Sequence, residues 1–163
     1  MKFMKLDPEE REIYLSTLSD MPGYIEESFS GLSQENLCKS GSEGEFSPIE
    51  QIWHLADLEE EGFFLRINAL LNGKAQKLSG FDGDKIAEER NYKSLSFTEG
   101  LEKFKRVRER NINIFQRLNE SDWMKEGFME DVGKISLCDM PSFLFQHDSA
   151  HKTEIENWKK ANA

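Results

Sequence analysis

Residues 46–59 read FSPIEQIWHLADLE and contain the clearest helix start in the chain. Residues 47–50 form a capping box with proline at the first helical position. Apolar residues then recur with the helical period, and no stop signal comes before the Asn-Gly pair at residues 72–73. We therefore expect a long amphipathic helix over residues 48–71. Its main apolar stripe consists of Ile49, Ile52, Trp53, Ala56, Phe63, Ile67 and Leu70.

The N-terminal segment carries similar helix-start signals. Residues 7–10 read DPEE, which offers an N-cap, a proline in the first turn and two acids at the positive end of the helix dipole. The apolar period continues to Phe29. Pro22 is expected to kink or split this helix, because proline has no N–H to donate. Residues 33–45 are polar and show no apolar period, so we expect a loop there.

Two more long helices are expected in the second half of the chain. A second capping box at residues 96–99 starts the third helix, which ends near residues 118–119. The fourth starts near residues 136–139 and runs to about residue 160, with Pro141 in its first turn. Four long helices without strand alternation indicate an all-α four-helix bundle. We expect all 163 residues to form a single domain.

Composition and charge bound the partners of this chain. A formal net charge of -10 repels a phosphate backbone, so we expect no nucleic-acid partner. No apolar run approaches the roughly 20 residues of a membrane-spanning helix, so we expect no membrane association. Cys38 and Cys138 are isolated, and the N-terminus lacks a secretory segment. These features predict reduced thiols and a cytoplasmic location.

The three histidines of the chain are the main functional candidates. His147 and His151 are four residues apart, so they share one face of the last helix, and that face is the apolar one expected to point inward. A shared metal ion satisfies both imidazoles, as do hydrogen bonds to tyrosine, carboxylate or backbone groups, and the pair alone leaves both interpretations open. His54 lies off the main apolar stripe of the second helix. A place at the seam toward the fourth helix suits a ligand.

The order of these segments resembles that of a known family. Residues 46–59 are similar to the second helix of the DinB-like (YfiT-like) metalloenzymes, and residues 133–137 and 145–155 resemble that family's final segment. The resemblance covers nearly the whole chain. It implies a four-helix bundle that holds a divalent metal ion, zinc or nickel, on one histidine of the second helix and two of the fourth. These positions are His54, His147 and His151.

Three acidic residues lie near the implied ligands. Glu154 stands where many relatives carry Gln, and it is a fourth ligand, a hydrogen-bond acceptor for an imidazole or a solvent-facing charge; we favour the acceptor. Asp57, one turn beyond His54, is a second candidate for supporting the implied ligands, and we favour a hydrogen bond or a surface salt bridge for it. Asp148 stands where His-Glu-x-x-His proteases carry their base, which makes it a candidate general base. The alternative for Asp148 is a capping or solvent-facing role.

Three neutral nitrogen ligands with an open coordination position are typical of a catalytic metal site. The resemblance implies an enzyme that uses a low-molecular-weight thiol, such as bacillithiol, mycothiol or glutathione, in S-transfer or isomerisation. The alternative is a metal-dependent hydrolase that activates water against a small ester or amide. A third interpretation is a non-catalytic stress-related protein that binds a metal and a small ligand.

Several large apolar residues have more than one possible role. Trp123, Phe128 and Met129 precede the last helix and form either a wall of the substrate pocket or part of the core. Phe63 and Phe64 add apolar surface to the second helix, which would allow two copies to pair as a homodimer.

Overall fold

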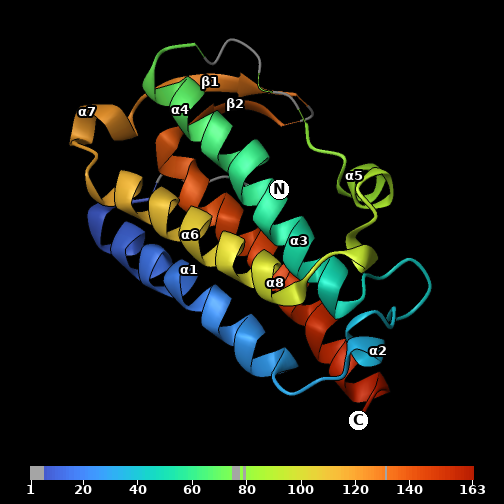
Figure 1. Cartoon of the computed structure of the whole chain (residues 1–163). Helices are drawn as coiled ribbons and strands as arrows, with labels where there is room; N and C mark the ends of the chain where they lie inside the picture. The colour runs from blue at the N-terminus through green and yellow to red at the C-terminus, as the bar shows by residue number, and fades with distance from the viewer. Residues whose placement is uncertain (1–5, 75–77, 79, 131) are drawn as a thin grey trace.

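Four long helical segments run side by side in the computed structural model, which describes residues 6–74, 78, 80–130 and 132–163 (Figure 1). Their arrangement confirms the four-helix bundle expected from the sequence. Among the described residues, every helix falls short of the length or hydrophobicity that membrane crossing requires. The four segments are α1 (Pro8–Phe29), the continuous α3–η1–α4 (Pro48–Asp57, Leu58–Phe64 and Leu65–Leu71), α6 (Phe97–Gln116) and α8 (Met140–Ala161).

The helix starts follow from the caps in the sequence. Ser47 accepts a hydrogen bond from the backbone N–H of Glu50, and the Glu50 side chain accepts one from the backbone of Ser47. Asp7 and Glu10 form the same reciprocal pair at the start of α1. Each box satisfies two backbone donors that a helix end leaves without partners. Pro141 lies in the first turn of α8, as expected.

The second helix runs over residues 48–71 as expected, but its middle segment η1 is wound as a π-helix. A π turn holds more residues than an α turn, so it changes which residues share a face. Asp57, Leu58 and Glu59 are all buried, although neighbours on a helix point about 100° apart. This part of the helix is therefore enclosed on several sides.

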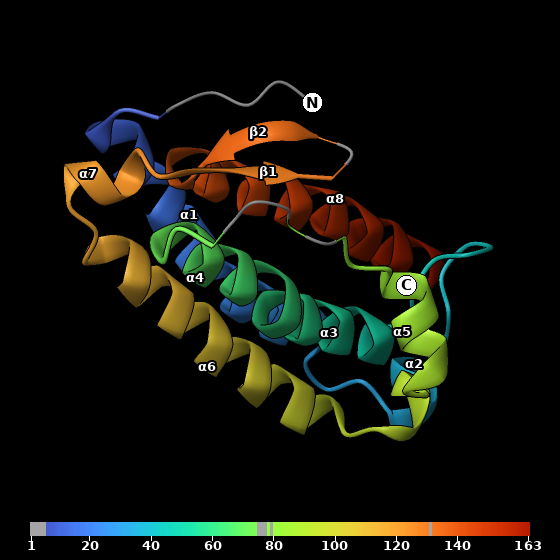
Figure 2. The same cartoon turned by 90° about the horizontal axis from the view of Figure 1, so that it is seen from above.

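Short elements connect the long helices. Figure 2 shows α5 and α2 at one end of the bundle and α7 at the other. The stretch of residues 33–45, expected to be a loop, contains the single-turn α2. The connection between α4 and α6 contains α5 and η2. The short helical elements among the described residues are α2 (Gln34–Leu37), α5 (Gly83–Glu89), η2 (Tyr92–Ser94), α7 (Glu120–Trp123) and η3 (Leu137–Asp139).

A small hairpin before α8 was not predicted from the sequence. Strands β1 (Glu126–Met129) and β2 (Gly133–Ser136) pair antiparallel, with Gly127 opposite Ile135. Four residues per strand are too few to establish an alternating pattern. Leu78 extends the hairpin, because its backbone N–H donates to the oxygen of Phe128 at 2.8 Å. Leu78 is thereby bonded to the hairpin.

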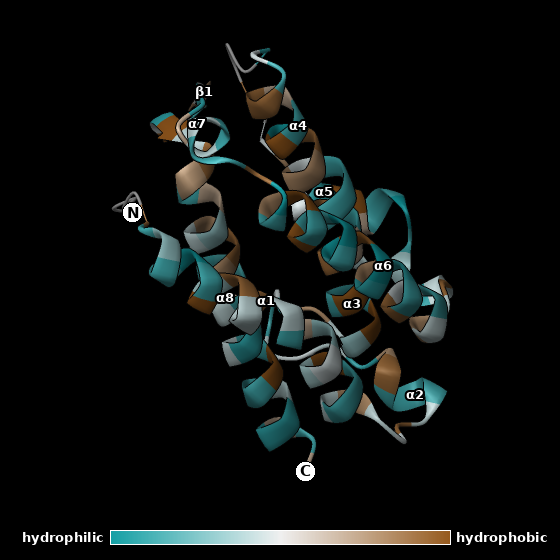
Figure 3. Ribbon diagram, turned by 90° about the vertical axis from the view of Figure 1, so that its left-hand side faces the viewer, coloured by the Kyte–Doolittle hydropathy of each residue, from teal (hydrophilic) through white to brown (hydrophobic). Residues whose placement is uncertain are grey.

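The apolar interior forms two clusters along the bundle. Figure 3 shows hydrophobic residues on α4 and mostly hydrophilic ones on the last turns of α8. Phe63 is buried in one cluster, and Arg110 covers Phe64, with its guanidinium carbon 3.4 Å from the ring centroid. These two rings therefore do not form the exposed apolar face that would favour pairing of two copies. The homodimer stays a prediction without support from these residues.

A buried arginine lies at the centre of the bundle. Arg108, from α6, donates to both carboxylate oxygens of Asp148 on α8, at 2.7 and 2.9 Å. It also donates to Glu59 of η1 at 3.0 Å. Asn111 donates to the second carboxylate oxygen of Glu59 at 2.8 Å. The charged groups are thus paired and hydrogen-bonded, as burial requires.

Arg108 also explains why Pro22 does not break α1. The missing N–H of a proline leaves the backbone oxygen four residues earlier, here that of Leu18, without its helical partner. Arg108 donates to that oxygen at 2.9 Å. The expected break is absent, and α1 is one helix from Pro8 to Phe29.

Replacing Arg108 by Met should destabilise the fold strongly. The substitution leaves Glu59 and Asp148 buried without their cation, and breaking a buried ion pair in this way costs about 3–5 kcal/mol. We expect the free energy of unfolding, measured by urea denaturation, to fall by this amount. Arg106→Met changes an exposed arginine of the same helix and should cost less than about 0.5 kcal/mol. Equal losses in both variants would contradict the role of Arg108.

Candidate metal centre

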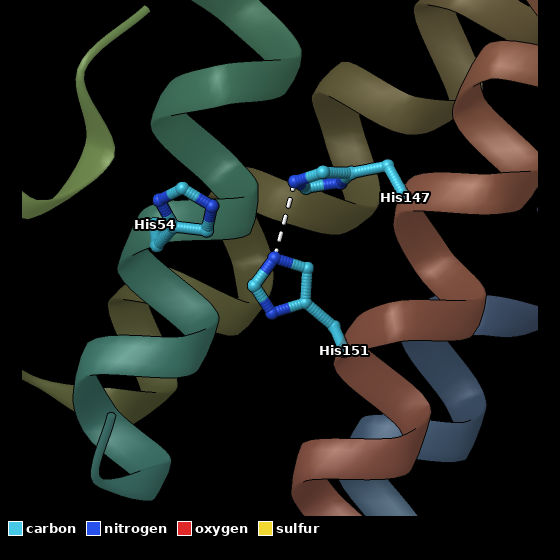
Figure 4. Close-up of side chains that lie close together, drawn as sticks. All are labelled: His54, His147 and His151. Atoms are coloured by element: carbon cyan, nitrogen blue, oxygen red, sulfur yellow. Dashed lines mark hydrogen bonds between the residues drawn. The ribbon is translucent and has the colours of Figure 1, made fainter. Parts of the chain in front are cut away.

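The three histidines converge between the second and fourth helices (Figure 4). His54 comes from α3, and His147 and His151 come from successive turns of α8. One ligand atom from each ring can be chosen so that all three lie within 4.8 Å of one another. The Nε2 atoms of His147 and His151 are 3.1 Å apart. The structure therefore brings together the residues that the family resemblance implied.

Burial keeps two of these imidazoles neutral. Burial, followed by the nearby His151 ring, lowers the pKa of His54 to about 3. Burial also holds the pKa of His147 well below its ordinary value, with further lowering by His151 and His54. A neutral imidazole retains the nitrogen lone pair that binds a metal ion. His54 and His147 are thus neutral, as metal binding requires, at neutral pH.

Gln51 fixes the orientation of His151. The Gln51 amide nitrogen donates to Glu154 at 2.6 Å, so its amide oxygen is the atom that lies 2.7 Å from His151 Nδ1. Nδ1 must then carry the proton, because an amide oxygen only accepts. The lone pair of His151 is left on Nε2, which faces His147. Sequence reasoning missed Gln51, although it lies one turn before His54 on the same helix.

Glu154 lies beside His151 and accepts a hydrogen bond from Gln51. Its Oε2 lies 3.5 Å from His151 Nδ1, close enough for electrostatic attraction. Interaction with His151, together with the hydrogen bond from Gln51, holds the pKa of Glu154 below its ordinary value. Glu154 therefore stays a carboxylate that anchors Gln51. It is not part of the close three-nitrogen cluster.

His54 is held by its surroundings rather than by hydrogen bonds. Its ring lies between the rings of Phe46 and Phe81, with centroid distances of 5.2 and 6.2 Å. A Cβ on Gly83, the first residue of α5, would come within 2.7 Å of Nδ1, so only glycine allows this close approach. Within the described ranges, Nδ1 of His54 is buried without a hydrogen-bond partner.

The cluster fits a divalent metal ion. Zinc–nitrogen bonds of about 2.0–2.1 Å place two ligand nitrogens of one ion no more than about 4.2 Å apart. The 3.1 Å pair already meets this limit, and the 4.8 Å bound on the cluster exceeds it by only about 0.6 Å. Three imidazoles, one of them oriented by a hydrogen-bond acceptor, form a common ligand set for such ions.

Asp57 makes hydrogen bonds to side chains outside the histidine cluster, the kind of role favoured from the sequence. Tyr92 donates to Asp57 at 2.6 Å, and Lys103 donates to its other oxygen at 2.6 Å. Arg90 adds a third hydrogen bond at 2.8 Å. Burial raises the pKa of Asp57, but these hydrogen bonds outweigh it and hold that pKa below its ordinary value. Asp57 instead ties α3 to η2 and α6.

Asp148 lies in the Arg108 network rather than at the cluster. Both of its oxygens accept hydrogen bonds from Arg108, and the side chain is buried. Adjacent helical residues point about 100° apart, so a neighbour of His147 is directed away from the face that carries both imidazoles. The geometry therefore gives Asp148 no role as a general base and instead makes it an ion-pair partner within the core.

The three candidates for the pocket wall lie in three different environments. Trp123 is buried and stacks on Phe115 with a centroid distance of 5.6 Å, so it is a core residue. Phe128 is exposed. Met129 lines a cavity beside His54 and His147.

A bundle with three clustered histidines on its second and fourth helices defines a helical protein with a candidate metal centre. A sequence model of the DinB superfamily matches residues 17–155, and the chain therefore belongs to that superfamily. Comparison with curated proteins gives no sequence match.

Two solved structures are similar to this fold. YfiT from Bacillus subtilis, described as a probable metal-dependent hydrolase with an unusual four-helix bundle topology, has a TM-score of 0.88 and 14% identity, over 99% of this chain and 92% of that one. A protein from Streptococcus pneumoniae has a TM-score of 0.69 and 13% identity, over 97% and 93% of the two chains. At such identities the likeness concerns the fold.

The neutral histidines make the stability of the metal-free protein depend on pH. Unfolded histidines take up protons near pH 6.5, whereas His54 and His147 have lowered pKa values in the fold. Below pH 6.5 the unfolded state therefore binds more protons, and the free energy of unfolding falls by about 1.4 kcal/mol per pH unit for each histidine. We expect this slope between pH 6.5 and 5 in urea titrations. His54→Phe should remove about half of it, and an unchanged slope would contradict the assignment.

Proposed function

We propose that this protein is a metal-dependent hydrolase of small molecules, with a divalent ion held by His54, His147 and His151. The observation that carries the proposal is the convergence of three imidazoles from two helices, two of them with strongly lowered pKa values. The description of YfiT as a probable metal-dependent hydrolase supports the same class of reaction. Zinc and nickel both suit imidazole ligands.

The side chains around the cluster have distinct roles in this proposal. Three protein ligands leave part of the coordination sphere open, and a bound ion there would polarise a carbonyl group and lower the pKa of water toward neutrality. Gln51 holds the proton on Nδ1 of His151 and so keeps Nε2 available as a ligand. The phenyl rings of Phe46 and Phe81 pack against His54 and limit its motion.

Hydrolysis of an ester illustrates the proposed reaction. Water supplies the oxygen of the new carboxylate, the bond between the acyl carbon and the alkoxy oxygen breaks, and the alcohol leaves with a proton. A second proton is released to solvent. The reaction needs no oxidant, reductant or third substrate.

Metal content provides the direct test. Protein purified without a His-tag or nickel column should contain about one ion per chain by elemental analysis. His147→Ala should lose most of it, because two imidazoles hold an ion less tightly than three, whereas Thr153→Ala, an exposed change on the same helix, should retain it. Equal metal content in wild type and His147→Ala would remove the proposed site.

Activity assays distinguish the proposed reaction from thiol transfer. Metal-loaded wild type is incubated with phenyl acetate, and separately with a low-molecular-weight thiol and an electrophile, with Thr153→Ala as a control of unchanged activity. The proposal expects ester hydrolysis that His147→Ala abolishes. Thiol conjugation without hydrolysis would replace the hydrolase by an S-transferase, and activity in neither assay would favour a non-catalytic metal-binding protein.

Gln51→Leu should weaken metal binding without unfolding the bundle. Losing the acceptor that orients a metal-binding imidazole typically lowers affinity by about 10–100-fold. Competition with a chromophoric chelator measures this change. Gln116→Leu alters an exposed glutamine at the end of α6 and should leave the affinity as it is. An unchanged affinity in Gln51→Leu would show that His151 needs no support from Gln51.

A further inference from the structure

An apolar chamber of about 450 Å³, partly open to solvent, lies directly beside the histidine cluster. Its volume falls within the range of small-molecule sites. The imidazoles of His54 and His147 form part of its wall, so a molecule inside would lie against the proposed centre. The other lining residues come from η1, α4, the α4–α5 connection, the hairpin and α8: Leu58, Phe63, Arg66, Phe81, Met129, Val132, Phe143, Gln146 and Ala150.

The lining decides what kind of group the chamber can hold. Apart from the two histidines, Arg66 and Gln146 are the polar side chains among the described lining residues. A sugar or another polyhydroxylated group would bury several hydroxyls against carbon atoms, and each buried hydroxyl without a partner is costly. An acyl chain or a phenyl ring loses little on leaving water and gains contacts with the walls.

Two of the proposed metal ligands form one wall of the chamber. His54 and His147, at one wall, have ring centroids 5.5 Å apart. Phe63 contacts His147 edge-on with a centroid distance of 5.9 Å, and Phe81 contacts His54 at 6.2 Å. The apolar wall therefore continues up to the imidazoles. A group seated in the chamber would hold an attached carbonyl next to the ligand atoms.

We propose that the substrate is an ester or amide with a compact apolar acyl or aryl group, and that this group fills the chamber beside His54 and His147. The inference rests on the proposed hydrolase function and specifies its substrate class. It assigns recognition to wall residues, chiefly Phe63, Phe81 and Phe143, rather than to hydrogen-bonding groups. A sugar group would find few hydrogen-bond partners in this lining.

Binding of a slowly hydrolysed amide tests the proposal without relying on turnover. The probe is 4-fluoroacetanilide, and its binding to metal-free protein is monitored by fluorine NMR. It should bind wild type, and its butyryl homologue should bind tighter by about fourfold per added methylene, the factor for burying a CH₂ group. N-acetylglucosamine, a polar molecule of similar size, should not displace it. Displacement by the sugar, or no binding of either anilide, would overturn the proposal.

Two variants at an exposed lining position locate the bound probe. Ala150→Trp fills the chamber from α8, and Ala150→Glu introduces a charge at the same place; both should weaken probe binding by about tenfold or more. Asn157→Trp makes the same change at an exposed α8 position outside the lining and should leave binding unchanged. Wild-type affinity in both Ala150 variants would place the probe elsewhere and overturn the proposal.

Failure of the chamber and failure of the metal site are separable. The Ala150 variants keep all three histidines, so their metal content by elemental analysis should equal that of wild type. If metal-free wild type binds the anilides but the protein as purified contains no metal, the hydrolase function alone is refuted. If the protein contains metal but does not bind the anilides, the substrate class alone is refuted.

Discussion

A single buried guanidinium connects all four long helices. Arg108 of α6 is bonded to the backbone of α1, to Glu59 of η1 and to Asp148 of α8. Asp148 directly follows His147, so the ion pair that anchors its carboxylate also fixes the rotation of α8 about its own axis. That rotation directs His147 and His151 toward His54. The geometry of the candidate centre thus depends on a charge cluster that belongs to the core.

Local signals in the sequence were enough to predict the long helices, because caps and apolar periods act within a few residues. The histidine cluster needed more: the i,i+4 spacing aligned two rings, and the family resemblance supplied the third. Partners distant in sequence were missed. Gln51 and His151 are 100 residues apart, and no pattern links them. Asp148 is paired with Arg108, which agrees with the alternative to the base role, and the helical period directs it away from the imidazoles.

Features that the sequence did not predict add to the chamber lining that the predicted α3, α4 and α8 provide. The π-helical η1 contributes Leu58 and Phe63, and the hairpin contributes Met129. A π turn has no strong sequence signature, and its bonds are stabilised by surrounding packing. The four-residue strands are held by pairing with each other and with Leu78. The bundle is thus specified locally, whereas the space beside its histidines arises from tertiary contacts.

The double role of two imidazoles has a thermodynamic consequence. His54 and His147 belong both to the candidate centre and to the chamber wall. Occupancy of the two places is therefore linked. If a bound ion changes the affinity for an organic guest by some factor, the guest must change the affinity for the ion by the same factor. A guest that binds more tightly to the metal-loaded protein would in turn slow the loss of metal to a chelator. Metal retention would therefore rise with the cellular level of substrate.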